Sequence, residues 1–213
     1  MAEIVKLPLP DSAVLDRAVN TLLNCGVVLF PTETVYGIGA DIRCPDAIQR
    51  LYEIKKRPYQ QSCLIHCSTL EQAALYVKQI PALAHLLAQK FLPGPLALIL
   101  PSSSKTPAIV RAQTNTVGIR VVNNPVFREI VSRLGAPLVG TSANRYGQPA
   151  TNDFNALDPE IIAQVDLAID AGKVGSGTPS TIIDLTTRQP RLLREGDIKR
   201  QELEQALGLK LAP

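Results

Sequence analysis

The sequence predicts a single layered α/β domain, with a twisted central sheet of mixed parallel and antiparallel strands flanked by helices. Short apolar runs alternate along the chain with segments whose apolar residues recur at helical spacing, which is typical of this fold class. The 17 prolines and 13 glycines supply many turns between these segments. With 213 residues, 46% hydrophobic and 19% charged, the chain is long and apolar enough for one globular domain with a sizeable core.

Each predicted helix has its own start or stop signal. Asp11 or Ser12 can cap the first helix, whose apolar face includes Leu15 and Leu22 and which we expect to end at Gly26. Ser68 and Glu71 form the pattern of a capping box for a later helix. The remaining helices are predicted to start near Pro45, Pro81, Pro125, Pro159 and Gln201.

The predicted strands are short apolar or alternating runs bounded by turn residues. The polar segments between them, above all 31–37, 102–115, 141–149 and 172–180, are predicted loops. The strands cover 27–30, 63–67, 96–100, 116–122, 137–140, 167–170, 181–185 and 191–194.

The net charge of +3 is unevenly distributed. Residues 54–128 carry nine Lys or Arg and a single carboxylate, that of Glu71. A field of one sign attracts an anionic ligand. Charge alone does not separate this interpretation from cations spread over a solvated surface. Aromatic residues make up only 4% of the chain and Trp is absent, which argues against a surface that stacks many single-stranded bases.

The sequence contains few signals for membrane targeting, secretion or cysteine chemistry. The longest apolar run, 96–100, is far too short to span a membrane, and residues 1–6 lack the apolar stretch of a secretory signal. We therefore expect a soluble, cytoplasmic protein with four free and mostly buried thiols. Alternation along a strand would put Cys63 and Cys67 on one face and His66 on the other, so we predict no metal site.

Several common catalytic motifs are absent from the sequence. There is no phosphate-binding P-loop, and residues 37–40 are only a fragment of a dinucleotide fingerprint. A Ser142–His66 hydrolase would lack an evident carboxylate to orient the histidine. What the sequence has instead is polar clusters at the ends of strands and helices, where α/β sheets gather ligands. They are 32–34, 55–57, Arg120, 142–144, 179–181 and Arg194.

Arg120 is the most informative of these residues, because a guanidinium within a strand needs an anionic partner. The other clusters have simpler explanations when taken singly. Lys55 and Arg57 could merely complement a helix dipole, and Ser142 and Asn144 could merely form a turn.

Taken together, these residues resemble the YrdC-like threonylcarbamoyl-AMP synthases. The similarity spans about residues 10–197 of one domain covering 1–213, which leaves a short helical tail. The matching segments, in order, are Pro-Thr-Glu-Thr-Val-Tyr-Gly at 31–37, Lys-Lys-Arg at 55–57, Pro-Gly-Pro at 93–95, Ser-Ala-Asn at 142–144, Ser-Thr-Ile-Ile-Asp at 180–184 and Leu-Arg-Glu-Gly at 193–196.

The resemblance implies a reaction that joins L-threonine, bicarbonate or CO2, and ATP to give threonylcarbamoyl-adenylate and pyrophosphate. It implies Mg²⁺ bound with the ATP and no dedicated protein metal site. It also implies that the product serves tRNA modification by a separate transferase. The nucleotide would be held by Lys55, Arg57, Thr116, Ser142, Asn144 and Arg194, with Lys55 and Arg57 as catalytic residues. Threonine would be held by Thr32, His66, Arg120 and Ser180.

The cationic residues suit this chemistry, because the reaction must bring two anions together in line. No enzyme nucleophile is needed. We expect this chain to have no counterpart of the C-terminal domain found in longer members of the family. Residues 102–115 are therefore the candidate lid over the site. The alternative is a protein of the same fold that binds RNA or ATP without synthase activity.

Overall fold

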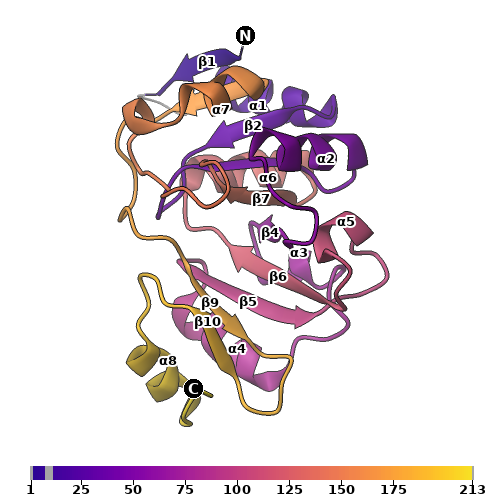
Figure 1. Cartoon of the computed structure of the whole chain (residues 1–213), viewed down its shortest axis with the longest axis vertical. Coiled ribbons are helices and arrows are strands. Elements are labelled where there is room, and N and C mark those ends of the chain that lie inside the picture. Colours follow the sequence, from indigo (N-terminus) through magenta and orange to yellow (C-terminus); the bar gives the residue numbers. More distant parts are fainter. Residues whose placement is uncertain (1, 8–11, 213) are drawn as a thin grey trace.

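The computed structural model describes residues 2–7 and 12–212, and it confirms the predicted α/β architecture. Over those residues one sheet of ten strands runs in the order β1-β8-β2-β3-β7-β4-β6-β5-β9-β10. The sheet extends along the molecule, with the two ends of the chain at opposite poles (Figure 1). The strands are β1 (Glu3–Lys6), β2 (Val27–Phe30), β3 (Gly37–Asp41), β4 (Leu64–Cys67), β5 (Leu96–Pro101), β6 (Thr116–Val121), β7 (Leu138–Ser142), β8 (Leu167–Asp170), β9 (Thr181–Asp184) and β10 (Arg191–Arg194).

The sheet is mixed, as predicted. Strand β8 pairs in parallel with both β1 and β2, β4 pairs in parallel with β6, and β5 with β9. The other neighbours are antiparallel.

The helices are short, and none among the described residues is long and apolar enough to cross a membrane. They are α1 (Ser12–Leu23), α2 (Pro45–Ile54), α3 (Leu70–Ala73), α4 (Ala82–Phe91), α5 (Ala108–Arg111), α6 (Pro125–Leu134), the 3₁₀ turn η1 (Phe154–Ala156), α7 (Pro159–Gln164) and α8 (Arg200–Leu207).

Two apolar clusters lie against the sheet, and the alternation of β2 separates them. Val27 and Leu29 belong to the cluster that includes α2, α4, α7 and α8. Val28 and Phe30 belong to the cluster formed with α1 and α6. Strands β4, β5, β6 and β9 also send alternate residues into the first cluster, so their intervening side chains point to the opposite face. The candidate site is built on that opposite face.

Two strands, β1 and β3, were not predicted. Strand β1 carries one buried residue, Val5, and therefore shows no apolar run. Strand β3 contains the Gly-Ile-Gly-Ala segment that reads as a dinucleotide-fingerprint fragment, but it pairs with β2 and β7. Its glycines make room for Phe30, because a Cβ at Gly37 or Gly39 would lie 2.7 or 3.0 Å from that ring.

The ends of two predicted helices are corrected. Helix α1 stops at Leu23, and Cys25 rather than Gly26 takes the left-handed backbone conformation. The alternative cap at Asp11 lies outside the described residues. Helix α3 is capped by Thr69, one residue later than expected, with the Gln72 amide donating to its hydroxyl.

The predicted polar loop 102–115 contains the short helix α5, and it packs against the body of the protein. Ser102 and Thr106 are buried within it. The Tyr52 hydroxyl donates to the Ile109 carbonyl at 3.0 Å, which fixes α5 beside α2.

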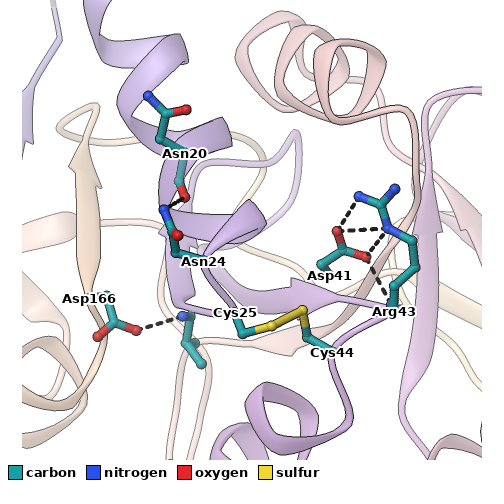
Figure 2. Close-up of a disulfide and its surroundings, with 8 residues drawn as sticks. Asn20, Asn24, Cys25, Asp41, Arg43, Cys44 and Asp166 are labelled. Carbon is teal, nitrogen blue, oxygen red and sulfur yellow. Dashed lines mark hydrogen bonds and ion pairs between the residues drawn. A yellow bond between two sulfur atoms is a disulfide. The ribbon is translucent and has the colours of Figure 1, made fainter.

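A disulfide joins Cys25 to Cys44, which corrects the expectation of four free thiols (Figure 2). The antiparallel pairing of β2 with β3 brings the turn before β2 close to the turn after β3, so the two Cα atoms lie 5.5 Å apart. That separation suits a disulfide. Their distance of 19 residues in the chain gave no sign of this proximity. Cys63 and Cys67 are free and buried, as predicted.

Replacing Cys25 with Ser should lower the free energy of unfolding by about 3 kcal/mol, because the disulfide restricts the unfolded chain over a loop of this length. Urea unfolding of the oxidised protein and of Cys25→Ser would measure the difference. A reductant should destabilise the parent protein to the same level and leave Cys25→Ser unchanged. A parent protein that is insensitive to reductant would contradict the prediction.

Candidate active site

A cavity of about 250 Å³ opens on the sheet face opposite the first apolar cluster. Its walls come from the loop after β2, the strands β4 to β6, the end of β7 and the segments around β9 and β10. Seven of the ten residues predicted for the site line it: Thr32, Arg57, His66, Arg120, Ser142, Ser180 and Arg194.

Arg120 lies at the centre of the site, on β6. Its Nη2 is 2.9 Å from the carboxylate of Glu33 and donates to the Thr34 hydroxyl at 2.9 Å. The guanidinium is therefore paired with an anion, as the sequence led us to expect. Its buried Nε has no hydrogen-bond partner among the described residues. Arg120 thus keeps one N–H donor that no described protein group uses, and a ligand carboxylate would satisfy it.

Two further guanidinium groups reach the same cavity. Arg57 is held by the carbonyl oxygens of Gln61 and Ser62, at 3.0 and 2.6 Å. Arg194 donates to the carbonyl and the hydroxyl of Ser180, at 2.9 and 3.2 Å. Burial, followed by the positive charge of Arg120 and Arg57, lowers the pKa of Arg194. Three converging cations oppose one carboxylate, so the site suits a polyanion.

His66 lies directly beside Arg120, because the two residues are register partners on β4 and β6. Its ring packs edge-on against Phe30 and Phe127. Burial, with a smaller contribution from the Arg120 charge, lowers the pKa of His66 to about 3. His66 is therefore neutral near physiological pH and can take part in hydrogen bonding without adding charge. Cys67 lies in the first apolar cluster, on the other face, as strand alternation predicts. Cys63 precedes β4 and also lines the cavity, so the prediction that it would face away from His66 is wrong.

Lys55 is buried and does not line the cavity. Its ammonium donates to the carbonyl oxygens of Ser142 and Asn144, and it lies 3.5 Å from the Asn144 side-chain oxygen. Burial and the nearby Arg57 charge lower the pKa of Lys55 to about 7. The Ser142 hydroxyl donates to the Asn144 side chain at 2.5 Å. Lys55 and Asn144 thus shape the loop that presents Ser142 to the cavity.

Thr116 does not reach the cavity. It begins β6, and its hydroxyl lies 3.1 Å from that of Thr114. Three of the predicted residues therefore do not line the cavity: Lys55, Asn144 and Thr116. Of these, Lys55 and Asn144 lie behind it.

Several contributors were not singled out from the sequence. Glu33 and Thr34 hold Arg120, and only their place within the Thr-Glu-Thr segment indicated a role. Gly140 makes room for the histidine, since a Cβ there would lie 2.2 Å from His66 Nδ1. The segment 175–177 holds the loop that carries Glu33 in place. The backbone amides of Ser176 and Gly177 donate hydrogen bonds to the carbonyl oxygens of Glu33 and Thr34. Gly175 has a positive φ and no room for a Cβ against the Glu33 backbone.

No group of three His, Cys, Asp or Glu side chains that could hold a metal ion occurs in the part of the chain that the structure describes. Glu33, which contacts the cavity residue Arg120, is already paired with it. The site is therefore built from cations, hydroxyl groups and one neutral imidazole.

The fold and the site together define an α/β protein with a cationic cavity on one face of a mixed sheet. Comparison with known protein families identifies the family to which the chain belongs. The family described as "Telomere recombination", which groups Sua5, YciO and YrdC proteins, matches residues 20–196. The chain belongs to this family, which confirms the resemblance drawn from its motifs.

Its relatives are consistent with that placement. A threonylcarbamoyl-AMP synthase of Xanthomonas campestris pv. campestris is 38% identical over 188 residues, covering 85% of this chain and 98% of the relative. One from Pyrococcus abyssi is 35% identical over 182 residues, and the match covers 85% of this chain and 54% of the relative. The chain thus spans about half the length of the longer relative.

A solved structure gives the same result. P. abyssi Sua5 complexed with L-threonine has a TM-score of 0.92 at 31% identity, covering 100% of this chain and 63% of that chain.

Removing His66 should make the protein less sensitive to acid. The pKa of His66 is about 3 in the folded state and about 6.5 in the unfolded chain, so only the unfolded chain takes up this proton between those values. Stability is therefore lost as the pH falls from 6.5 towards 3. In His66→Asn, the slope of unfolding free energy against pH should be smaller by about 1.4 kcal/mol per pH unit between pH 6 and 4. The exposed His85 offers the control, and an equal change in slope in His85→Asn would contradict the assignment.

Lys55→Met should destabilise the protein, because it leaves two carbonyl oxygens without their donor in a buried position. We expect a loss of about 3 kcal/mol in urea unfolding. Arg57→Met serves as the control, since the hydrogen bonds of Arg57 are exposed and its loss should change stability by less than about 0.5 kcal/mol. Equal stability of Lys55→Met and the parent protein would show that the ammonium does not organise this loop.

Proposed function

We propose that this chain is a threonylcarbamoyl-AMP synthase, which joins L-threonine, bicarbonate or CO2, and ATP to give threonylcarbamoyl-adenylate and pyrophosphate. The convergence of Arg57, Arg120 and Arg194 on one cavity, around a neutral His66, is the observation that supports this activity most directly. Family membership supports it as well, together with relatives that carry this name.

The threonine would lie at the Arg120 end of the cavity. Its carboxylate would pair with the guanidinium edge that has no protein partner, and its hydroxyl suits the neutral side chains of Thr32, His66 and Ser180. The neutral threonine amine attacks the carbon of CO2 and loses a proton to solvent, which gives a carbamate. From bicarbonate, the same carbamate forms with release of water. A carbamate is anionic and would be drawn toward the same cationic cavity.

The nucleotide would lie across Arg57, Arg194 and the Ser142 loop. A carbamate oxygen attacks the α-phosphorus, and the bond to the bridging oxygen breaks, releasing pyrophosphate. This step needs two anions aligned and the developing charge neutralised, which guanidinium groups provide. Lys55 and Asn144 act as positioning residues for the loop. A nucleotide contact from Thr116 remains a prediction from the family.

Mg²⁺ would be held mainly by phosphate oxygens of the nucleotide, because no carboxylate of the described residues lines the cavity and Glu33 is paired with Arg120. When bound, the ion would offset phosphate charge alongside the arginines. The product would pass to a separate transferase that modifies adenosine in tRNA, so we infer that the protein acts in the cytoplasm.

Pyrophosphate release from ATP with Mg²⁺ should require both threonine and bicarbonate, and mass spectrometry should detect the threonylcarbamoyl-adenylate. Arg120→Ala should raise the KM for threonine at least tenfold, because a charged hydrogen bond to the carboxylate is lost. The KM for ATP should change little. Release that ignores threonine would contradict the synthase, and ATP or RNA binding without turnover would support a non-catalytic protein of this fold.

A further inference from the structure

The cavity is too small to enclose both substrates. Its volume is about 250 Å³, whereas sites that enclose ligands of ordinary drug size measure about 300–1,000 Å³. ATP alone is of that size, and threonine must occupy part of the same space. If the phosphates meet Arg57 and Arg194, the adenosine must extend past the rim of the cavity.

An exposed aromatic residue, Tyr146, lies beside Arg57. Tyr146 is 43% exposed, and the Arg57 guanidinium carbon lies 5.6 Å from the centroid of its ring. Arg57 itself lines the cavity. A cation over the ring is favourable, and it leaves part of the ring's surface in contact with solvent.

The position of Tyr146 is fixed by its backbone. Its amide donates to the Lys55 carbonyl at 2.9 Å, which ties it to the segment that carries Arg57. The Asn144 side chain donates to the carbonyl oxygens of Arg145 and Gln148, at 2.8 and 2.6 Å, and so closes the turn on both sides. Gly147, with φ of +80°, completes that turn. A large apolar ring is therefore held in solvent by a well-ordered turn.

We infer that Tyr146 is the platform on which the adenine base of ATP stacks. Arg57 would connect the two parts of the nucleotide, with its guanidinium against the ring on one side and facing the phosphates on the other. Base stacking on an aromatic side chain contributes about 1–3 kcal/mol. This inference rests on the proposed function, since it assumes that the cavity takes ATP.

A second exposed tyrosine provides a matched control. Tyr59 is 45% exposed, and its ring stacks on Tyr52 with centroids 5.3 Å apart. It neither contacts Arg57 through its ring nor lines the cavity, so its loss removes a similar surface from a different place.

Calorimetric titration with ATP and with inorganic tripolyphosphate, both with Mg²⁺, separates base from phosphate binding. Tyr146→Ala should weaken ATP binding about tenfold, within the range of about 5- to 150-fold that stacking allows. It should leave tripolyphosphate binding unchanged. Tyr146→Phe, which keeps the ring, and Tyr59→Ala should both bind ATP as the parent protein does. In steady-state assays, Tyr146→Ala should raise the KM for ATP and preserve kcat.

Two results with the Tyr146→Ala variant would overturn the platform and leave the proposed function standing. One is unchanged ATP binding in Tyr146→Ala. The other is an equal loss of ATP and tripolyphosphate binding, which would mean that Tyr146 acts only by placing Arg57. A parent protein that binds tripolyphosphate but gains nothing from the adenosine of ATP would also exclude a base platform. Failure of the parent protein to bind ATP at all would contradict both the platform and the proposed function.

Discussion

The buried ammonium of Lys55 is the interaction on which the site depends. It donates to the carbonyl oxygens of Ser142 and Asn144, and so joins the end of α2 to the turn after β7. Burial of a cation is unfavourable, as its lowered pKa indicates, and the carbonyl oxygens compensate by accepting hydrogen bonds from the ammonium. The Tyr146 amide closes the connection by donating to the Lys55 carbonyl. The Lys-Lys-Arg and Ser-Ala-Asn segments are therefore one structural unit, although 84 positions of chain lie between them.

Around that unit, apolar and polar side chains of the central strands lie on opposite faces of the sheet. Apolar residues of β4, β5, β6 and β9 fill one face, and the opposite face holds the cavity. Because strand side chains alternate, His66 and Arg120 stand side by side on the cavity face. Glu33 balances only part of the positive charge. At this end of the cavity the charge comes from Arg120, whose Nε has no partner in the described part of the chain, and the neutral His66 adds only hydrogen-bonding capacity.

Local structure was predicted best where short-range signals are strong. Strands 27–30 and 191–194 have the predicted bounds, and the helix at Pro125 ends before Gly135 as expected. These elements have clear periodicity or strong stop signals, which act over a few residues. Strands β1 and β3 lacked such signals, because one is largely exposed and the other is rich in glycine needed for Phe30. Their place is decided by partners that are distant in the chain.

The fold class, the family and most of the residues that meet in the cavity could be predicted from the order of residues along the chain. The part that each residue plays in the site depends on how the folded chain packs. The tertiary structure turned Lys55 inward, left Thr116 outside, gave Arg120 its partner in Glu33 and set Tyr146 against Arg57. It also brought Cys25 to Cys44. The reason is physical: residue type and local period are written in consecutive positions, whereas these contacts join residues that strand pairing and the loops between strands bring together.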